Sequence, residues 1–256
     1  MDQWILNAGI VILVAFVPSL LYLVWIRNTE RFSREPYGRL LWVFSIGAIL
    51  SVGVAVVLEI ILSALFDQNI ERVYQYLGEN PNLSSLVLAC VIAPVVEELA
   101  KALGVFRVRS ALHELENGIV YGAAAGLGFA ATENLLYEGT AFITAGTEAW
   151  IATAALRSVS SALLHASASS VVGFGIAKST LNGSSWVPYY IIAVLMHGSF
   201  NFAASFGALY ADQMGDAAYL IGLAAAFAIA IIGIIAVRGK IRSLDRGRGW
   251  RRARRR

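Results

Sequence analysis

The chain has 256 residues, of which 58% are hydrophobic and only 14% are charged, and its mean hydropathy is +0.67. A soluble domain of this length needs far fewer apolar residues to build one core. The composition therefore excludes an ordinary water-soluble enzyme and indicates a membrane protein, with a small net charge of +3.

Seven apolar stretches follow one another along the chain. Each has roughly 20 or more residues, the length that a helix needs to cross the hydrocarbon core of a bilayer. A transmembrane β-barrel would show shorter segments of alternating character instead. The predicted fold is therefore an all-α, polytopic membrane bundle of about seven transmembrane helices. The predicted spans are residues 4–26, 40–66, 84–106, 117–137, 151–177, 187–210 and 217–237.

Positive charge separates the connecting segments into two sets. One set, together with the C-terminal tail, holds 17 of the 20 Lys and Arg residues, whereas the opposite set holds only Arg72. Under the positive-inside rule the C-terminus is cytoplasmic and the N-terminus lies outside, which requires an odd number of crossings. The first span has no basic region before it and no cleavage site after it, so we expect it to be retained.

The connecting segments are too short to form a soluble domain. We therefore expect one transmembrane domain, residues 1–237, and a basic cytoplasmic tail, residues 238–256. Beside a final span such a tail typically fixes orientation and contacts anionic lipid headgroups, so no nucleic-acid partner is expected. In the fourth span Gly118, Gly122 and Gly126 have the four-residue spacing that predicts close helix packing.

The third span carries ionisable residues that a membrane interior disfavours. Each such side chain near the bilayer centre costs roughly 2.5–3.5 kcal/mol, so Glu97, Glu98 and Lys101 must face protein or water. Glu97 and Lys101 share a helix face, whereas Glu98 points about 100° away and needs a partner from another span. Pro94 removes the amide that would bond the carbonyl of Cys90, which predicts a kink and an open polar acceptor. A buried ion pair that only fixes helix packing is the structural alternative.

The next three spans carry further polar residues at membrane depth. One such residue is often only an interhelical hydrogen-bond partner, but four consecutive spans that carry them indicate a shared polar site. Glu59, near the outer end of the second span, is assigned to the membrane interface. The polar residues are Glu133 and Asn134, then Arg157 and His165, then His197 and Asn201.

The depth of these residues can be counted from the cytoplasmic ends of their spans. At 1.5 Å per residue, Glu97, His165 and His197 lie within about 5 Å of one level and can meet. The same count places Glu133 about 9 Å deeper than His197.

Four motifs resemble those of a known protease family. EELAK at 97–101 resembles the EExxK motif of the PrsW proteases, FAATEN at 129–134 resembles their FxxxEN motif, and His165 and HGSFN at 197–201 resemble their two later histidine motifs. In the related CAAX-processing and bacteriocin-immunity proteases the first two motifs usually end in Arg and His, so Lys101 and Glu133 favour the PrsW branch. The resemblance implies a protease of the prokaryotic cytoplasmic membrane that cleaves membrane-anchored proteins, typified by anti-sigma factors.

Peptide hydrolysis needs a base that activates water, donors for the oxyanion and an acid for the leaving amine. We expect Glu97 to be the base, with Glu98 assisting or orienting it. The remaining roles are polarisation of the scissile carbonyl, and placement of water or the leaving group. The predicted catalytic residues are therefore six. Glu97 and Glu98 act in water activation, His197 and Asn201 polarise the carbonyl, and His165 and Glu133 position the water or the leaving group.

Other functions stay open at the level of sequence. The resemblance points to a metal-independent glutamate mechanism, and no HExxH motif is present, so no cofactor is expected. Zinc is the alternative, since two His and several carboxylates are available. An ion-coupled secondary transporter also gathers Glu, His and Asn near the midplane. A non-catalytic membrane scaffold or immunity protein is the third class.

Overall fold

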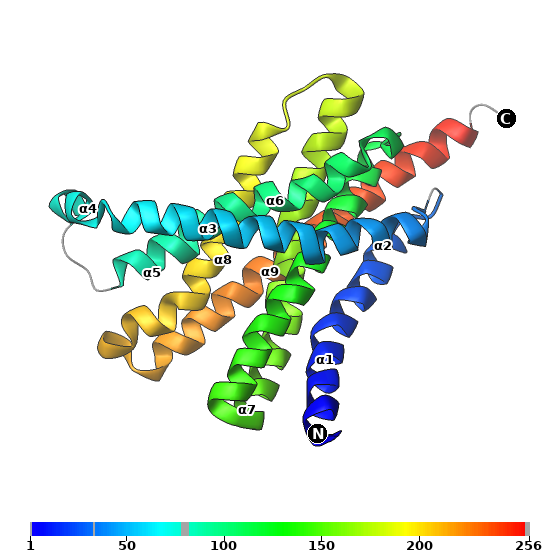
Figure 1. The fold of residues 1–256 in the computed structure, drawn as a ribbon. Coiled ribbons are helices and arrows are strands. Elements are labelled where there is room, and N and C mark those ends of the chain that lie inside the picture. Colours follow the sequence, from blue (N-terminus) through cyan, green and yellow to red (C-terminus); the bar gives the residue numbers. More distant parts are fainter. Residues whose placement is uncertain (1, 33, 78–81, 254–256) are drawn as a thin grey trace.

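A computed structural model describes residues 2–32, 34–77 and 82–253 (Figure 1). The described residues form helices and no strand, which confirms the all-α prediction. The α-helices are α1 (Asp2–Arg27), α2 (Tyr37–Ser45), α3 (Val52–Asp67), α4 (Ile70–Leu77), α5 (Leu83–Val87), α6 (Ala93–Arg107), α7 (Leu115–Asn182), α8 (Val187–Met214) and α9 (Asp216–Ala253). Two π-helical segments, η1 (Ile46–Ser51) and η2 (Leu88–Ile92), join α2 to α3 and α5 to α6, and a short 3₁₀ turn, η3 (Arg109–Ala111), follows α6.

Six helical stretches of the described chain are long and apolar enough to cross a membrane. One of them, α7, contains both the fourth and the fifth predicted span, because Gly146 interrupts it with φ +83° and ψ −171°. The helix turns back on itself there, and its two arms lie side by side in Figure 1. The seven crossings and their orientation stay predictions.

The glycine spacing of the first arm of α7 sets the register of this hairpin. A Cβ added at any of the three predicted packing glycines would collide with a backbone carbonyl of the second arm. The contacts are antiparallel, because each step of four residues forward on one arm is a step of four residues back on the other. The close-packing prediction is confirmed, and the pairs are Gly118 with Gly173, Gly122 with Ser169 and Gly126 with His165.

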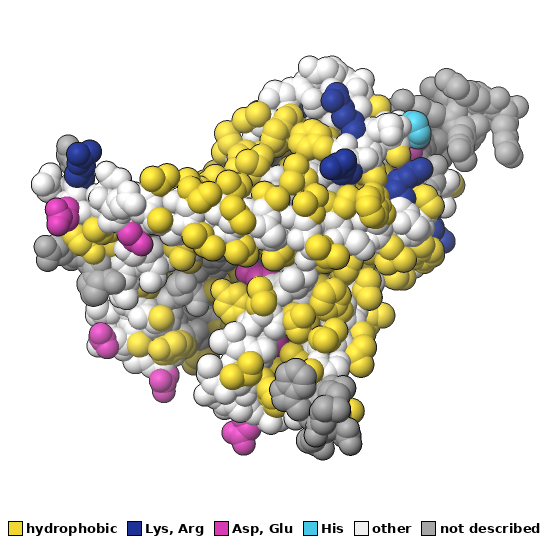
Figure 2. Space-filling model, viewed as in Figure 1, with side chains coloured by type: hydrophobic (Ala, Val, Ile, Leu, Met, Phe, Trp, Pro, Cys, Tyr) yellow, Lys and Arg dark blue, Asp and Glu magenta, His cyan; other side chains and the backbone are white. Residues whose placement is uncertain are grey.

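The α7 hairpin forms the core of the bundle, and the other helices surround it. α7 is largely buried, whereas the remaining spans keep most of their surface exposed. Large apolar side chains cover those outer surfaces (Figure 2), as expected for a protein in lipid. α9 runs without interruption from Asp216 to Ala253, so the boundary predicted at 237 falls inside one helix.

The segment before Pro94 widens to π-helical spacing. In that spacing the amide that would bond the carbonyl of Ala89 is that of Pro94, which has no hydrogen. Asn201 Nδ2 donates to this carbonyl instead, at 2.7 Å. The sequence predicts an open acceptor at Cys90 on the basis of α-helical spacing, whereas the carbonyl that Asn201 bonds is that of its neighbour Ala89.

Candidate active site within the membrane bundle

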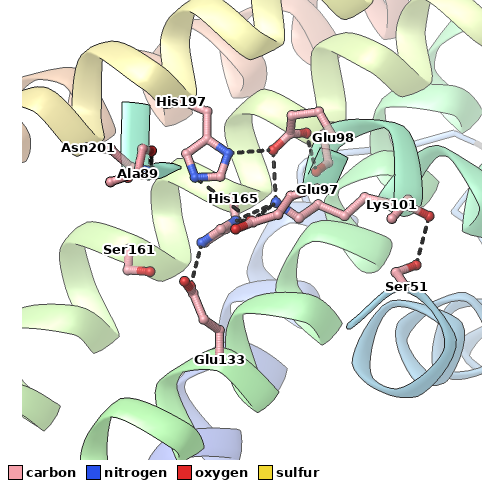
Figure 3. A network of polar contacts seen from close by, with 12 residues as sticks. Ser51, Ala89, Glu97, Glu98, Lys101, Glu133, Ser161, His165, His197 and Asn201 are labelled. Atoms are coloured by element: carbon pink, nitrogen blue, oxygen red, sulfur yellow. Dashed lines mark hydrogen bonds and ion pairs between the residues drawn. The ribbon is translucent and has the colours of Figure 1, made fainter. Parts of the chain in front are cut away.

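The ammonium of Lys101 lies at the centre of a buried polar cluster (Figure 3). Its Nζ is 2.9 Å from Glu97 Oε2, 2.9 Å from Glu98 Oε1 and 2.7 Å from His165 Nδ1. It also lies 4.2 Å from the centre of the Phe129 ring. The predicted pairing of Glu97 with Lys101 is confirmed, and one cation compensates two adjacent carboxylates.

Glu98 points into the protein and holds a histidine from another helix. Its Oε1 lies 3.0 Å from His197 Nδ1 on α8, and its Oε2 accepts a hydrogen bond from Ser169 Oγ at 2.9 Å. Its exposed fraction is 0%. Glu98 therefore orients the imidazole of His197 but offers no surface to a substrate.

Glu133 contacts and orients the other histidine, His165. Its Oε2 lies 2.9 Å from His165 Nε2 and accepts a 2.7 Å hydrogen bond from Arg157 Nη2. Arg157 Nε also donates to Asn134 Oδ1, at 2.9 Å. The sequence marks Arg157 only as a polar residue of its span, and the structure makes it the residue that fixes Glu133.

The predicted depth mismatch of Glu133 does not keep it from His165. The two residues lie on opposite arms of the α7 hairpin, where Gly126 faces the backbone of His165. Glu133 is therefore about two turns farther out than His165. The side chains of Glu133 and His165 extend toward each other and together span this distance.

The two imidazoles and Glu97 converge on one point, as their common level predicts. The rings of His165 and His197 are 4.8 Å apart and nearly perpendicular. Glu97 Oε2 is 3.9 Å from His165 Nδ1 and 3.9 Å from His197 Nε2. Both distances are too long for direct hydrogen bonds. Lys101 Nζ lies between the atoms of the first pair, whereas the second pair suits a bridging water.

A cavity of about 480 Å³ reaches this cluster. Glu97, Glu133, His165 and Asn201 are all part of its wall, whereas Glu98 and Lys101 lie behind it. Glu59 also lines the cavity, and its assignment to the membrane interface stays a prediction.

The cavity lies in one half of the bundle. Its wall is made by the start of α6 and by the parts of α3, η2, α7 and α8 that extend away from the basic connecting segments. Figure 2 shows acidic side chains in the recess between α3 and α7. The exposed apolar residues Leu88, Val56 and Leu136 border it.

The convergent residues offer a donor set for a metal ion. Glu97, His165 and His197 each present one ligand atom, and these atoms lie within 4.8 Å of one another. One carboxylate with two imidazoles is a known ligand set of catalytic zinc. The second nitrogen of each ring is held by a carboxylate, as in many metal sites. The residues therefore fit a divalent metal in donor type, although the Lys101 ammonium occupies two of the three ligand atoms.

Comparison with known proteins agrees with the motifs. A family model described as "PrsW family intramembrane metalloprotease" matches residues 35–232. The protein named "Protease PrsW" from Clostridioides difficile (strain 630) is 29% identical over 200 residues, which cover 74% of this chain and 77% of that protein. No solved structure gives a significant match. The region matched by the family model includes every residue of the cluster described above.

Proposed function

The chain belongs to the PrsW family of intramembrane proteases, and we propose that the cluster around Lys101 is its active site. One observation carries this proposal. Glu97 and His165 lie on the wall of a cavity inside the bundle, while the Lys101 ammonium that contacts both of them is buried behind that wall. Such an arrangement exposes a water-activating carboxylate to a substrate and keeps its supporting groups fixed.

We propose Glu97 as the base that takes a proton from the attacking water. The tautomer of His197 follows from its partner: Nδ1–H donates to Glu98, so Nε2 carries a lone pair that faces Glu97. A water between Glu97 Oε2 and His197 Nε2 would donate one hydrogen to each. Its own lone pair would then face the cavity, ready to attack a carbonyl carbon.

This tautomer of His197 changes the role expected for it. A lone pair at His197 Nε2 accepts a hydrogen bond and does not polarise a carbonyl, so that role falls to Asn201. The Nδ2 group of Asn201 has a second hydrogen besides the one donated to Ala89. We propose that this hydrogen holds the developing oxyanion, and that the proton taken by Glu97 passes to the leaving amine. Arg157 and Glu133 keep His165 in place throughout.

Activation of the water by a zinc ion is the second candidate mechanism, because two imidazole lone pairs and a carboxylate face one point. When bound to Glu97, His165 and His197, a divalent metal would polarise the water and the scissile carbonyl. We propose the metal-independent mechanism for this chain because the ammonium of Lys101 already fills the position between Glu97 Oε2 and His165 Nδ1.

The shape of the cavity supports cleavage of a membrane-anchored protein. Apolar, exposed side chains border the opening, so a substrate helix can enter sideways from lipid. Under the predicted orientation the cavity lies in the outer half of the membrane. We therefore propose substrates of the anti-sigma-factor type, with a single span, that are cut on the outer side.

Membrane proteomics on cells that express either the wild-type chain or Glu97→Gln tests this proposal. Truncated single-span proteins should be present with the wild type and absent with Glu97→Gln. Glu148→Gln, which changes an exposed carboxylate outside the cavity, serves as the matched control and should cleave normally. Full cleavage by Glu97→Gln would remove Glu97 as the base, and substrate uptake into vesicles without any cleavage would indicate a transporter.

Chelator treatment of the purified protein decides between the two ways of activating water. We expect cleavage to survive metal removal. Loss of cleavage on chelation, restored by zinc, would make Glu97 a metal ligand instead of the base.

A further inference from the structure

A second cavity lies in the opposite half of the bundle, away from the active site. It has a volume of about 290 Å³ and lies between the second arm of α7, α8 and α9. Its wall is apolar apart from its mouth; the hydroxyl of Ser170 in its floor is already bonded to the carbonyl of Ile119, at 3.0 Å. A peptide or a nucleotide would find no free donors in such a wall, whereas an acyl chain needs none.

Lys240 lines the mouth of this groove, and Lys178 is bonded to Tyr189 of its wall. Lys240 Nζ lies 5.2 Å from the centre of the Phe174 ring, and Lys178 Nζ donates to Tyr189 Oη at 2.9 Å. The rings of Phe174 and Tyr189 contact each other edge to face, with centroids 5.3 Å apart. Neither ammonium forms an ion pair with any described residue. The mouth is therefore a cationic site without a counter-ion, next to an aromatic pair.

We propose that this groove binds one acyl chain of an anionic phospholipid. The lipid phosphate then lies near Lys240 and Lys178, and their positive charges strengthen the binding. The groove extends from Lys240 to Gly233, which is about 10 Å along α9. That length takes the first part of an acyl chain when the headgroup lies level with the lysines. Charge complementarity selects an anionic headgroup over a zwitterionic one.

The position of the groove gives the lipid a structural role. Ser170 and Phe174 lie on the arm of α7 that also carries His165. A chain bound against this arm would brace it from the side opposite the catalytic cavity. Bound lipid should therefore raise the unfolding temperature of the whole protein, since it binds the folded state alone.

Native mass spectrometry of the delipidated full-length protein tests the site, with phosphatidylglycerol, phosphatidylcholine of the same chains and inorganic phosphate as separate probes. We expect one preferred phosphatidylglycerol adduct, a higher unfolding temperature in its presence, and no adduct with phosphate alone. Lys240→Gln should reduce the preference for phosphatidylglycerol about fivefold, the effect of one lysine near an anionic headgroup. Arg242→Gln removes a nearby exposed charge that does not line the groove and should change nothing.

A second variant tests the groove itself. Ala236 is exposed and lines the groove, so Ala236→Phe should fill it and abolish the preferred adduct while the protein remains folded. Equal effects of Lys240→Gln and Arg242→Gln, or an undiminished adduct in Ala236→Phe, would overturn the proposal and reduce the binding to ordinary annular lipid. Because Lys240 is exposed and its replacement leaves the apolar core intact, the result stays interpretable even if Ala236→Phe misfolds.

Discussion

Replacing Lys101 by Met should be among the most damaging single changes in the site. The variant removes the ammonium that lies 2.9 Å from both Glu97 and Glu98 and leaves two buried carboxylates without that cation. Removing one partner of a buried ion pair typically lowers the free energy of unfolding by about 3–5 kcal/mol. That is a large part of the roughly 5–15 kcal/mol that stabilises most folded proteins.

A double-mutant cycle separates the loss of charge balance from the loss of catalysis. Glu98→Gln alone leaves Lys101 paired with Glu97 and should cost less, about 1–3 kcal/mol. The double variant Lys101→Met, Glu98→Gln returns the net charge of these three side chains to its wild-type value, so its free energy of unfolding should lie above that of Lys101→Met. Both variants that lack the ammonium should still fail to cleave, because His165 Nδ1 has lost its donor.

The assay is denaturant unfolding in detergent micelles, together with cleavage of a defined single-span substrate and zinc analysis of each variant. A free energy of unfolding of Lys101→Met within 1 kcal/mol of the wild type, with normal cleavage, would refute the role of the ammonium. Stoichiometric zinc in Lys101→Met that restores cleavage would show that the lysine fills a metal position.

Three further changes test other parts of the site. Gly122→Leu should separate the arms of α7, lowering the unfolding temperature and abolishing cleavage, whereas Gly139→Ala, with open space around it, should be neutral or slightly stabilising. Arg157→Lys keeps the charge but loses the forked hydrogen bonds, so the cleavage rate should fall by about tenfold while the unfolding temperature hardly changes. Asn201→Ala leaves the carbonyl of Ala89 without its donor, which should lower the free energy of unfolding by about 1–3 kcal/mol and also slow cleavage, as single-turnover assays would show.

The sequence predicts much of this site because a helix has a fixed rise. Counting residues from the ends of three spans is enough to bring Glu97, His165 and His197 to one level, and the structure joins them. The membrane spans can also be predicted from the sequence, since a helix that crosses lipid must be long and apolar. These properties depend on single helices and need no knowledge of how the helices pack.

Features that depend on side-chain reach and on register are harder to predict. The count gives the height of a Cα atom, so it places Glu133 about 9 Å deeper than His197. It does not show how the side chains of Glu133 and His165 extend toward each other. It also gives no reason to place Arg157 beside Glu133, because that contact follows from the turn at Gly146 and from the pairing of the two α7 arms. Antiparallel register is a property of two packed segments and has no local signal.

The two adjacent acids of the EELAK motif show why one helix position cannot replace the other. They lie about 100° apart around α6. This angle turns Glu97 toward the cavity and Glu98 toward the protein interior, where it holds His197. Lys101, one turn later, lies within reach of both. The proposed base, the carboxylate that contacts His197 and the cation that pairs with both thus come from one turn of one helix. The remaining spans need only supply the two imidazoles and the cavity wall.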